Sequence, residues 1–165
     1  METTVKRPNN CTNEELHIFE SLVLQGGQVS PQGLRRRIKL AEWLITLSDN
    51  KCLAVGAIKK PDEEYRTRIF TEAGARMKAS EYEYEFGWLY VIPKARDRRY
   101  AHKLIRSAIA VLGNSHCFAT TRTNNRSMNH LLAKYSFKQL GSSYLSKDGS
   151  HSLTLYVYHP CATIL

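Results

Sequence analysis

The stretch YVIPKARDRRYAHKLIRSAIAVLG, Tyr90–Gly113, decides the fold of this chain. A strand-like run stops at Pro93, and apolar residues at helical spacing follow until the closing glycine. Between the two lie Arg96, Arg98 and Arg99. A helix N-terminus presents unpaired backbone N–H groups and the positive end of the helix dipole, so arginines there predict a site for a phosphate or pyrophosphate. A solvated helix end that binds nothing is the alternative interpretation.

Periodicity on either side of this stretch predicts a mixture of helices and strands. Amphipathic spacing favours helices over 12–27, over 30–40 starting at Ser30, and over 124–137. Strand-like runs cover 42–48, 51–60, 82–93, 116–122, 138–146 and 152–159. Polar residues 61–80 predict an insertion or a long loop, with room for a helical turn. The strand–helix–strand order over 82–122 favours a right-handed parallel crossover, and hairpins lie toward both ends. This order predicts an α/β (α+β) fold with a mixed sheet.

Composition restricts the class of protein. The 165 residues fit one domain, and 42% hydrophobic with 10% aromatic residues exclude a disordered chain. No apolar run approaches the roughly 20 residues of a membrane helix, and the N-terminus lacks the apolar segment of a signal peptide. We therefore expect a cytoplasmic protein with no membrane partner. The 4 cysteines and 6 histidines show no metal-ligand spacing, which predicts no metal site.

Charge favours an anionic partner. The chain has 24 Lys and Arg against 15 Asp and Glu, a net charge of +9, so nucleic acid is one possible partner and a phosphate-bearing cofactor is another. Three carboxylates lie in EYEYE, residues 81–85, just before the arginine-rich stretch. Glu83 and Glu85 are two residues apart in a predicted strand, so they are expected to share a face.

Two segments resemble the GNAT superfamily of N-acetyltransferases. The family's acyl-CoA-binding segment is a strand ending in Val-x-Pro, then Arg/Gln-x-x-Gly-x-Gly/Ala opening a helix with a Leu-Leu or Leu-Ile pair. The residues that match it are Val91, Pro93, Arg96, Ala101, Leu104 and Ile105. The segment NNRSMNHLLAKYSF is similar to the family's later motif, with Asn125, Leu131 and Phe137 at the family's spacing.

The resemblance covers about residues 42–158 and implies a fold and a domain plan. It implies a single domain over 1–165, with a mostly antiparallel sheet, a central crossover and helices on both faces. The expected parts are N-terminal helices over 12–40, a cofactor-binding core over 42–122, and a C-terminal helix and strand hairpin over 123–160.

The resemblance implies acetyl-CoA as co-substrate and gives its contacts. The pantetheine arm would pair with the strand backbone at Leu89, Tyr90 and Val91. The pyrophosphate would lie on the loop and helix start, at Arg96, Arg98, Arg99, Tyr100, Ala101 and His102, and the helix-capping Asn125 would contact the CoA arm. Arg99 and Asp97 stand where the family commonly has glycine, and an arginine there still offers its N–H if its φ is negative.

The resemblance also implies direct acetyl transfer to a primary amine, with no covalent enzyme intermediate. The predicted base that deprotonates the ammonium is Glu85, with Glu83 second; the alternative is that both are rim charges. Leu132 takes the place of the family's tyrosine acid. Tyr135 is the candidate that would protonate the leaving thiolate, with Tyr144 or water as substitutes, and the alternative is that this proton transfer is dispensable.

The acceptor and the partners stay open at this point. The acceptor would be an amine-bearing small molecule or protein. Two alternatives are a basic nucleic-acid-binding protein, or an acetyltransferase acting on aminoacyl-tRNA, and a third is a degenerate family member that binds CoA without turnover. The apolar C-terminal segment, residues 156–165, also allows a homodimer.

Overall fold

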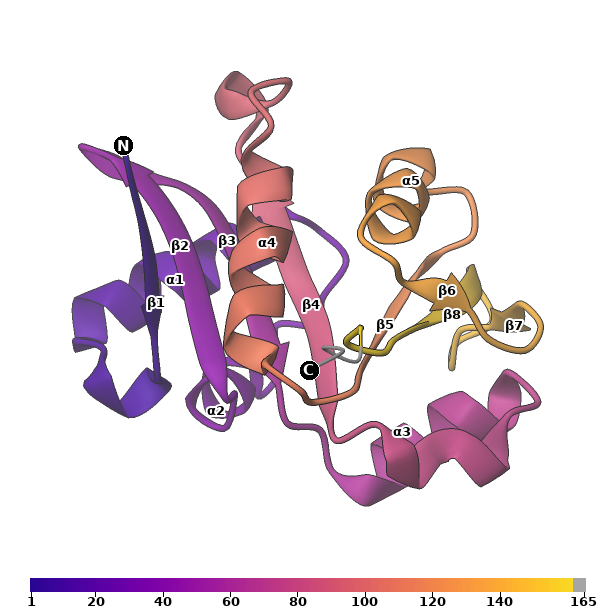
Figure 1. The fold of residues 1–165 in the computed structure, drawn as a ribbon. Helices are drawn as coiled ribbons and strands as arrows, with labels where there is room; N and C mark the ends of the chain where they lie inside the picture. Colours follow the sequence, from indigo (N-terminus) through magenta and orange to yellow (C-terminus); the bar gives the residue numbers. More distant parts are fainter. Residues whose placement is uncertain (162–165) are drawn as a thin grey trace. The chain divides into compact units, whose positions relative to one another are not determined.

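The computed structural model describes residues 1–161. In it the chain forms a sheet with helices packed on it (Figure 1). The strand order is β1-β2-β3-β4-β5-β8-β6, with β7 paired to β8. The β4–β5 pair is parallel, while β1–β2, β2–β3, β5–β8, β6–β8 and β7–β8 are antiparallel. The predicted mixed, mostly antiparallel sheet with a central crossover is confirmed.

The chain divides into two compact units, which are described separately. Unit 1 contains Met1–Lys60 and Phe86–Val111, and unit 2 contains Pro61–Glu85 and the described residues from Leu112 onward. The division falls within β4 (Tyr84–Val91).

The sheet of unit 1 contains a strand that the sequence pattern did not predict. Three strands precede its part of β4, namely β1 (Glu2–Lys6), β2 (Trp43–Asp49) and β3 (Lys51–Lys59). β1 is the new one, because five residues with two polar threonines give too short an alternation to recognise. β2 and β3 form the predicted hairpin, joined by Asn50 alone, which takes a left-handed φ of 59°.

The helices of unit 1 begin where local capping allows. α1 (Asn13–Gln25) has the predicted start, since Thr12 Oγ1 accepts from the Glu15 N–H at 3.1 Å while Glu15 Oε2 accepts from the Thr12 N–H at 2.8 Å. The helix predicted from Ser30 is shorter, because Gly33 at φ 69° cannot lie within a helix and α2 (Leu34–Lys39) begins after it. Two 3-10 turns, η1 (Pro8–Asn10) and η3 (Pro93–Ala95), complete the unit together with α4.

Helices cover both faces of the unit 1 sheet. α1 and α2 lie on one face, and α4 (Tyr100–Leu112) lies on the other (Figure 1). The first face is filled by Phe19, Leu34, Ile38, Leu44 and Val55, and Leu104 and Ile105 of α4 are completely buried. Each such side chain contributes about 1.5–3 kcal/mol by leaving water.

Unit 2 is built around two long antiparallel strands. β5 (Cys117–Arg122) pairs with β8 (Ser152–Tyr158), and the short β6 (Lys138–Gln139) and β7 (Tyr144–Leu145) also pair with β8. The predicted hairpin around Gly149 joins β7 to β8. α5 (Arg126–Lys134) follows β5 as predicted.

Segment 61–80 was expected to be an insertion or a long loop, and the long loop is wrong, because this segment is mostly helical. α3 (Glu63–Glu72) is followed by the 3-10 helix η2 (Arg76–Glu81). Within α3 only Ile69 and Phe70 are buried, so its sequence carries little apolar periodicity. Both side chains pack in the core of unit 2 with β5, β7 and β8. The remaining sequence signal was the cap, in which Asp62 Oδ1 accepts from the Tyr65 N–H at 2.7 Å.

The C-terminal segment 156–165 was expected to allow packing on a second copy. Its first residues, up to Tyr158, complete β8 and are buried against unit 2. Residues 162–165 lie outside the described part of the chain.

Candidate functional site

The middle of β4 contains an irregularity that changes where its side chains point. A Cβ added at Gly56 would lie 3.7 Å from the Phe86 ring and 3.9 Å from Leu104 of α4, so Phe86 lies on the α4 face. Trp88 instead contacts Phe19 of α1, with ring centroids 6.3 Å apart. Residues two apart in a regular strand share a face, and the reversal follows from the left-handed φ of 52° at Trp88.

The pairing of β4 with β5 is short. The register covers Tyr84↔Cys117 and Glu85↔Phe118, which are the first two of the eight β4 residues. The predicted pantetheine contacts, Leu89, Tyr90 and Val91, lie in the later part of β4, within unit 1. Tyr90, like Trp88, also packs against the core formed with α1.

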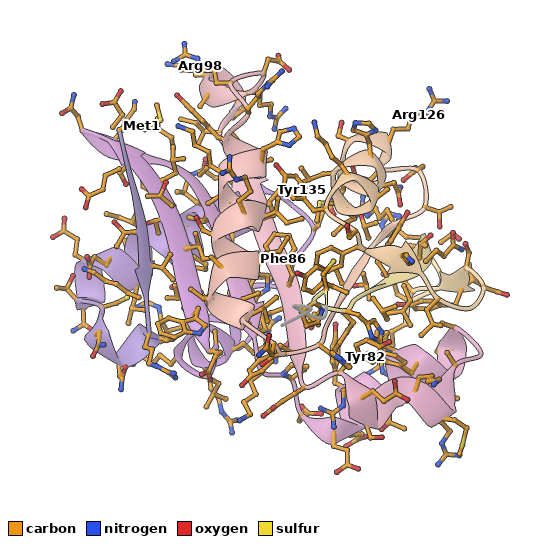
Figure 2. The ribbon with its side chains drawn as sticks, in the orientation of Figure 1. Met1, Tyr82, Phe86, Arg98, Arg126 and Tyr135 are labelled. Carbon is orange, nitrogen blue, oxygen red and sulfur yellow. The ribbon has the colours of Figure 1, made fainter. Side chains whose placement is uncertain are left out.

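The arginine loop, residues 96–99, connects η3 to α4. Its side chains are exposed, whereas the flanking Ala95 and Tyr100 are 3% and 5% exposed and fix the two ends of the loop. Arg98 lies at the tip of this loop (Figure 2). Arg96 folds back, and its Nε donates to the Val91 carbonyl at 3.4 Å. All the predicted pyrophosphate contacts therefore lie in unit 1, in the arginine loop and the first residues of α4 that follow it.

Two residues of the arginine loop that are not glycine adopt the left-handed backbone conformation that glycine favours. Asp97 has φ 63° and Arg99 has φ 59°, so the condition of a negative φ under which Arg99 would offer its N–H is not met. A non-glycine residue in the left-handed region costs about 1–2 kcal/mol, because its Cβ approaches the following carbonyl. The backbone of the loop is thus strained at the two positions where the family commonly has glycine.

This strain predicts opposite outcomes for two neighbouring glycine substitutions. Arg99→Gly relieves the left-handed strain, while Arg98→Gly does not, because Arg98 is not among the described residues with positive φ. Both substitutions increase the conformational entropy of the unfolded chain by the same amount. The difference between the two melting temperatures therefore reports the backbone strain at Arg99. We expect Arg99→Gly to melt about 4 °C above Arg98→Gly in thermal unfolding. Equal melting temperatures would contradict the strain.

The two predicted base candidates lie in different environments in unit 2. Glu83 precedes β4 and is exposed, whereas Glu85 lies inside β4 and is only 3% exposed. The hydroxyl of Tyr65, from α3, donates to Glu85 Oε1 at 3.3 Å. Burial, and then the charge of Glu85, raise the pKa of Tyr65 well above its usual value. Tyr65 was not predicted from the sequence, because residues 61–80 show too little apolar periodicity to indicate a helix.

Tyr144 of β7 lies in the same core of unit 2 as Tyr65. Its side chain is 7% exposed and packs in the core of unit 2, where Tyr65 also packs. Burial, and then the charge of Glu85, raise the pKa of Tyr144 far above that of a free phenol. A phenol that holds its proton so tightly is a poor donor to a thiolate, so Tyr144 does not suit the role of general acid.

α5 carries the two remaining predicted residues. Asn125 caps the helix as predicted, because its Oδ1 accepts from the Met128 N–H at 3.1 Å. Tyr135 lies at the C-terminal end of α5, is half-buried, and precedes Ser136, which has a left-handed φ of 66° at the family's glycine position. Leu132, at the family's tyrosine position, is completely buried.

Among the described residues there is neither a metal-binding cluster nor a membrane-spanning helix. No three His, Cys, Asp or Glu side chains gather closely enough to hold a metal ion. No helix in residues 1–161 is long and apolar enough to cross a membrane.

Several solved structures share the fold of this chain over nearly its whole length. Among solved structures, an acyl-CoA N-acyltransferase from Pseudomonas aeruginosa is similar at TM-score 0.68 and 14% identity, covering 94% of this chain and 97% of that one. ElaA from Escherichia coli is similar at TM-score 0.72 and 10% identity, covering 96% and 100%. The ribosomal-protein-S18-alanine N-acetyltransferase from Escherichia coli gives 0.67 and 12%, covering 96% and 94%.

At these low identities the structural neighbours show the fold alone. No curated protein matches the sequence. The sequence model of the acetyltransferase (GNAT) family, however, matches residues 15–137, which is most of the chain. This chain therefore belongs to the GNAT family of acetyltransferases.

Proposed function

We propose that this protein is an N-acetyltransferase that moves the acetyl group of acetyl-CoA directly to a primary amine of a small molecule or protein. The observation that supports this most is the arginine loop, which follows β4 with its left-handed Trp88 and opens α4 in a chain of the GNAT family. Acyl-CoA-dependent N-acyl transfer is the chemistry of that family.

The residues of the arginine loop fit the phosphates of CoA. Three exposed guanidinium groups and one carboxylate, Asp97, surround the start of α4, where backbone N–H groups and the helix dipole also favour an anion. Net charge is concentrated in the same unit, because unit 1 holds 15 of the 24 Lys and Arg but 7 of the 15 Asp and Glu. In our proposal Arg96, Arg98 and Arg99, with the backbone of Tyr100, Ala101 and His102, hold the pyrophosphate.

The backbone of β4 would hold the pantetheine arm. Leu89, Tyr90 and Val91 offer peptide groups in a strand whose register with β5 covers only Tyr84 and Glu85. The Val91 carbonyl accepts from Arg96 Nε, so CoA would replace this contact and turn the guanidinium toward its phosphates. Asn125 would contact the CoA arm from the start of α5.

In the proposed chemistry a carboxylate removes one proton from the acceptor's ammonium. Glu85 is the first candidate and Glu83 the second. The neutral nitrogen attacks the thioester carbonyl and a C–N bond forms. The C–S bond breaks as CoA leaves as a thiolate that Tyr135 would protonate, and the surplus proton on the new amide nitrogen would pass to Tyr135 and restore its hydroxyl. Cys117 does not suit a covalent route, because its side chain is 0% exposed in β5 and its thiol points to the Phe118 carbonyl.

The binding half of this proposal predicts a charge-dependent affinity for acetyl-CoA. We expect micromolar binding in isothermal titration calorimetry, weakened at least about tenfold in the Arg96→Ala/Arg98→Ala protein, because charge-assisted contacts to phosphate are lost. Arg36→Ala/Arg37→Ala on α2 is the matched control, since it removes the same charge from the same unit. No binding at low salt, or equal weakening in both double variants, would count against the proposed site.

A further inference from the structure

Gly87 lies in the interior of β4, although its own backbone does not require glycine. It is not among the described glycines with a positive φ. Glycine inside a strand weakens the strand, because it loses more backbone freedom on folding and has no side chain to pack. A glycine at such a position often marks the close approach of another group to the backbone. The surroundings of Gly87 contain such a group.

The group that approaches Gly87 is the end of the Lys59 side chain. A Cβ added at Gly87 would lie 2.8 Å from Lys59 Cε and 3.0 Å from Lys59 Nζ. Lys59 is the last residue of β3, and its ammonium lies 5.2 Å from the centre of the Trp88 ring. The negative face of an indole ring attracts a cation. All three residues are half-buried and belong to unit 1, so this unit holds one positive charge against the middle of β4.

The proposed contacts of CoA set the order of its parts along β4. The pyrophosphate lies on residues 96–102, and the pantetheine arm lies on residues 89–91. The sulfur is at the end of that arm far from the pyrophosphate, so it comes next to Trp88 and Gly87. Leu132, at the family's tyrosine position, offers the sulfur no hydroxyl. A cation beside the sulfur is therefore of direct use in this chain.

We propose that Lys59 is a catalytic residue that presents a fixed positive charge to the thioester end of acetyl-CoA. Negative charge develops on the thioester oxygen as the amine attacks, and then on the sulfur as the C–S bond breaks. A preorganised ammonium stabilises both charges. Lys59 keeps its protons throughout, and the thiolate takes its proton from Tyr135 as before. The placement of the sulfur rests on the proposed function.

The test titrates the thiol of bound CoA, without turnover. Thiolate formation is followed by ultraviolet absorbance at saturating CoA. The complex with desulfo-CoA, which has no thiol, gives the background from the protein's own 4 cysteines and its tyrosines. We expect Lys59→Met to raise the midpoint by about 1 pH unit, because a nearby cation favours the thiolate. A lysine that only packs on Trp88 would not affect this midpoint.

Two further variants control for charge. Lys59→Arg should keep the midpoint near the wild-type value, because the positive charge remains. Lys51→Met is the matched control, since it removes the same charge from the other end of β3, about 26 Å away along the strand. A midpoint in Lys59→Met equal to that in Lys51→Met would overturn the role of Lys59.

Gly87→Ala tests the geometry with the lysine still present. The three atoms nearest to the added methyl group all belong to the flexible end of Lys59. The strand is therefore kept while the ammonium is displaced, and we expect the midpoint to rise in this variant too. A midpoint that stays at the wild-type value in Gly87→Ala would also overturn the inference, even if Lys59→Met does not fold.

The outcomes separate this inference from the proposed function. If CoA binds and no variant moves the thiol midpoint, the role of Lys59 alone fails. If the midpoint moves as expected but wild type acetylates no amine, the proposed function fails while the charge at the sulfur is supported. If wild type does not bind CoA at all, both fail.

Discussion

Glu85→Gln should lower the turnover number for acetyl transfer by about 10²–10⁴-fold, because general base catalysis typically contributes that much. The assay is thiol release from acetyl-CoA, with the amine that gives the highest wild-type rate in a panel of amines, proteins and aminoacyl-tRNA. The affinity for acetyl-CoA should stay near the wild-type value, because glutamine keeps the shape of the side chain and the proposed CoA contacts do not include it.

Glu83→Gln tells the two candidate carboxylates apart. Glu83 is exposed and lies before β4, while Glu85 is buried and receives the Tyr65 hydrogen bond. We expect the Glu83 variant to lose less than about threefold, as an exposed rim charge would. A large loss in Glu83→Gln with a small one in Glu85→Gln would reverse the assignment, and small losses in both would remove the general base from the account.

Gly141→Ala should be the most destabilising single substitution that we predict, lowering the free energy of unfolding by about 3–5 kcal/mol. A Cβ at this position would lie 1.9 Å from the Ala73 carbonyl oxygen, and the φ of 70° already disfavours any side chain. The same carbonyl accepts from the Ser142 N–H at 2.9 Å, so relief of the clash also breaks this bond between α3 and the segment after β6. The melting temperature should fall by about 10 °C.

Gly149→Ala is the matched control for this effect. Gly149 has nearly the same φ, 74°, but nothing lies within 4 Å of an added Cβ. Its cost should be the backbone strain alone, about 1 kcal/mol and about 3 °C in the melting temperature. Equal melting temperatures for the two variants would mean that the close approach of Gly141 to the Ala73 carbonyl does not contribute to stability as described.

The part of the fold that local signals specify could be predicted from the sequence. The capping box of Thr12 and Glu15 located α1, and the apolar face containing Leu104 and Ile105 located α4 after the arginine loop. Long-range packing decided the rest. α3 is stable because Ile69 and Phe70 pack against distant strands, which a polar helix sequence does not reveal.

The candidate site stays a prediction, and local signals again decided which of its residues could be named. Charge and the resemblance to family motifs singled out the arginine loop and the two carboxylates. Spacing did not distinguish Glu83 from Glu85, because the difference between them is burial. Tyr65 lies 20 residues from Glu85, and no local pattern links them. The left-handed backbone at Asp97 and Arg99 also contradicts what their side chains alone would favour.

The central claim is that the arginine loop and the start of α4 hold the pyrophosphate of CoA, and a crystal structure with bound CoA tests it most directly. The account predicts the pyrophosphate within hydrogen-bond distance of the backbone N–H groups of residues 98–102, with Arg96 turned from the Val91 carbonyl toward the phosphates. CoA bound elsewhere on the chain, with the side chains of residues 96–99 still in solvent, would contradict it.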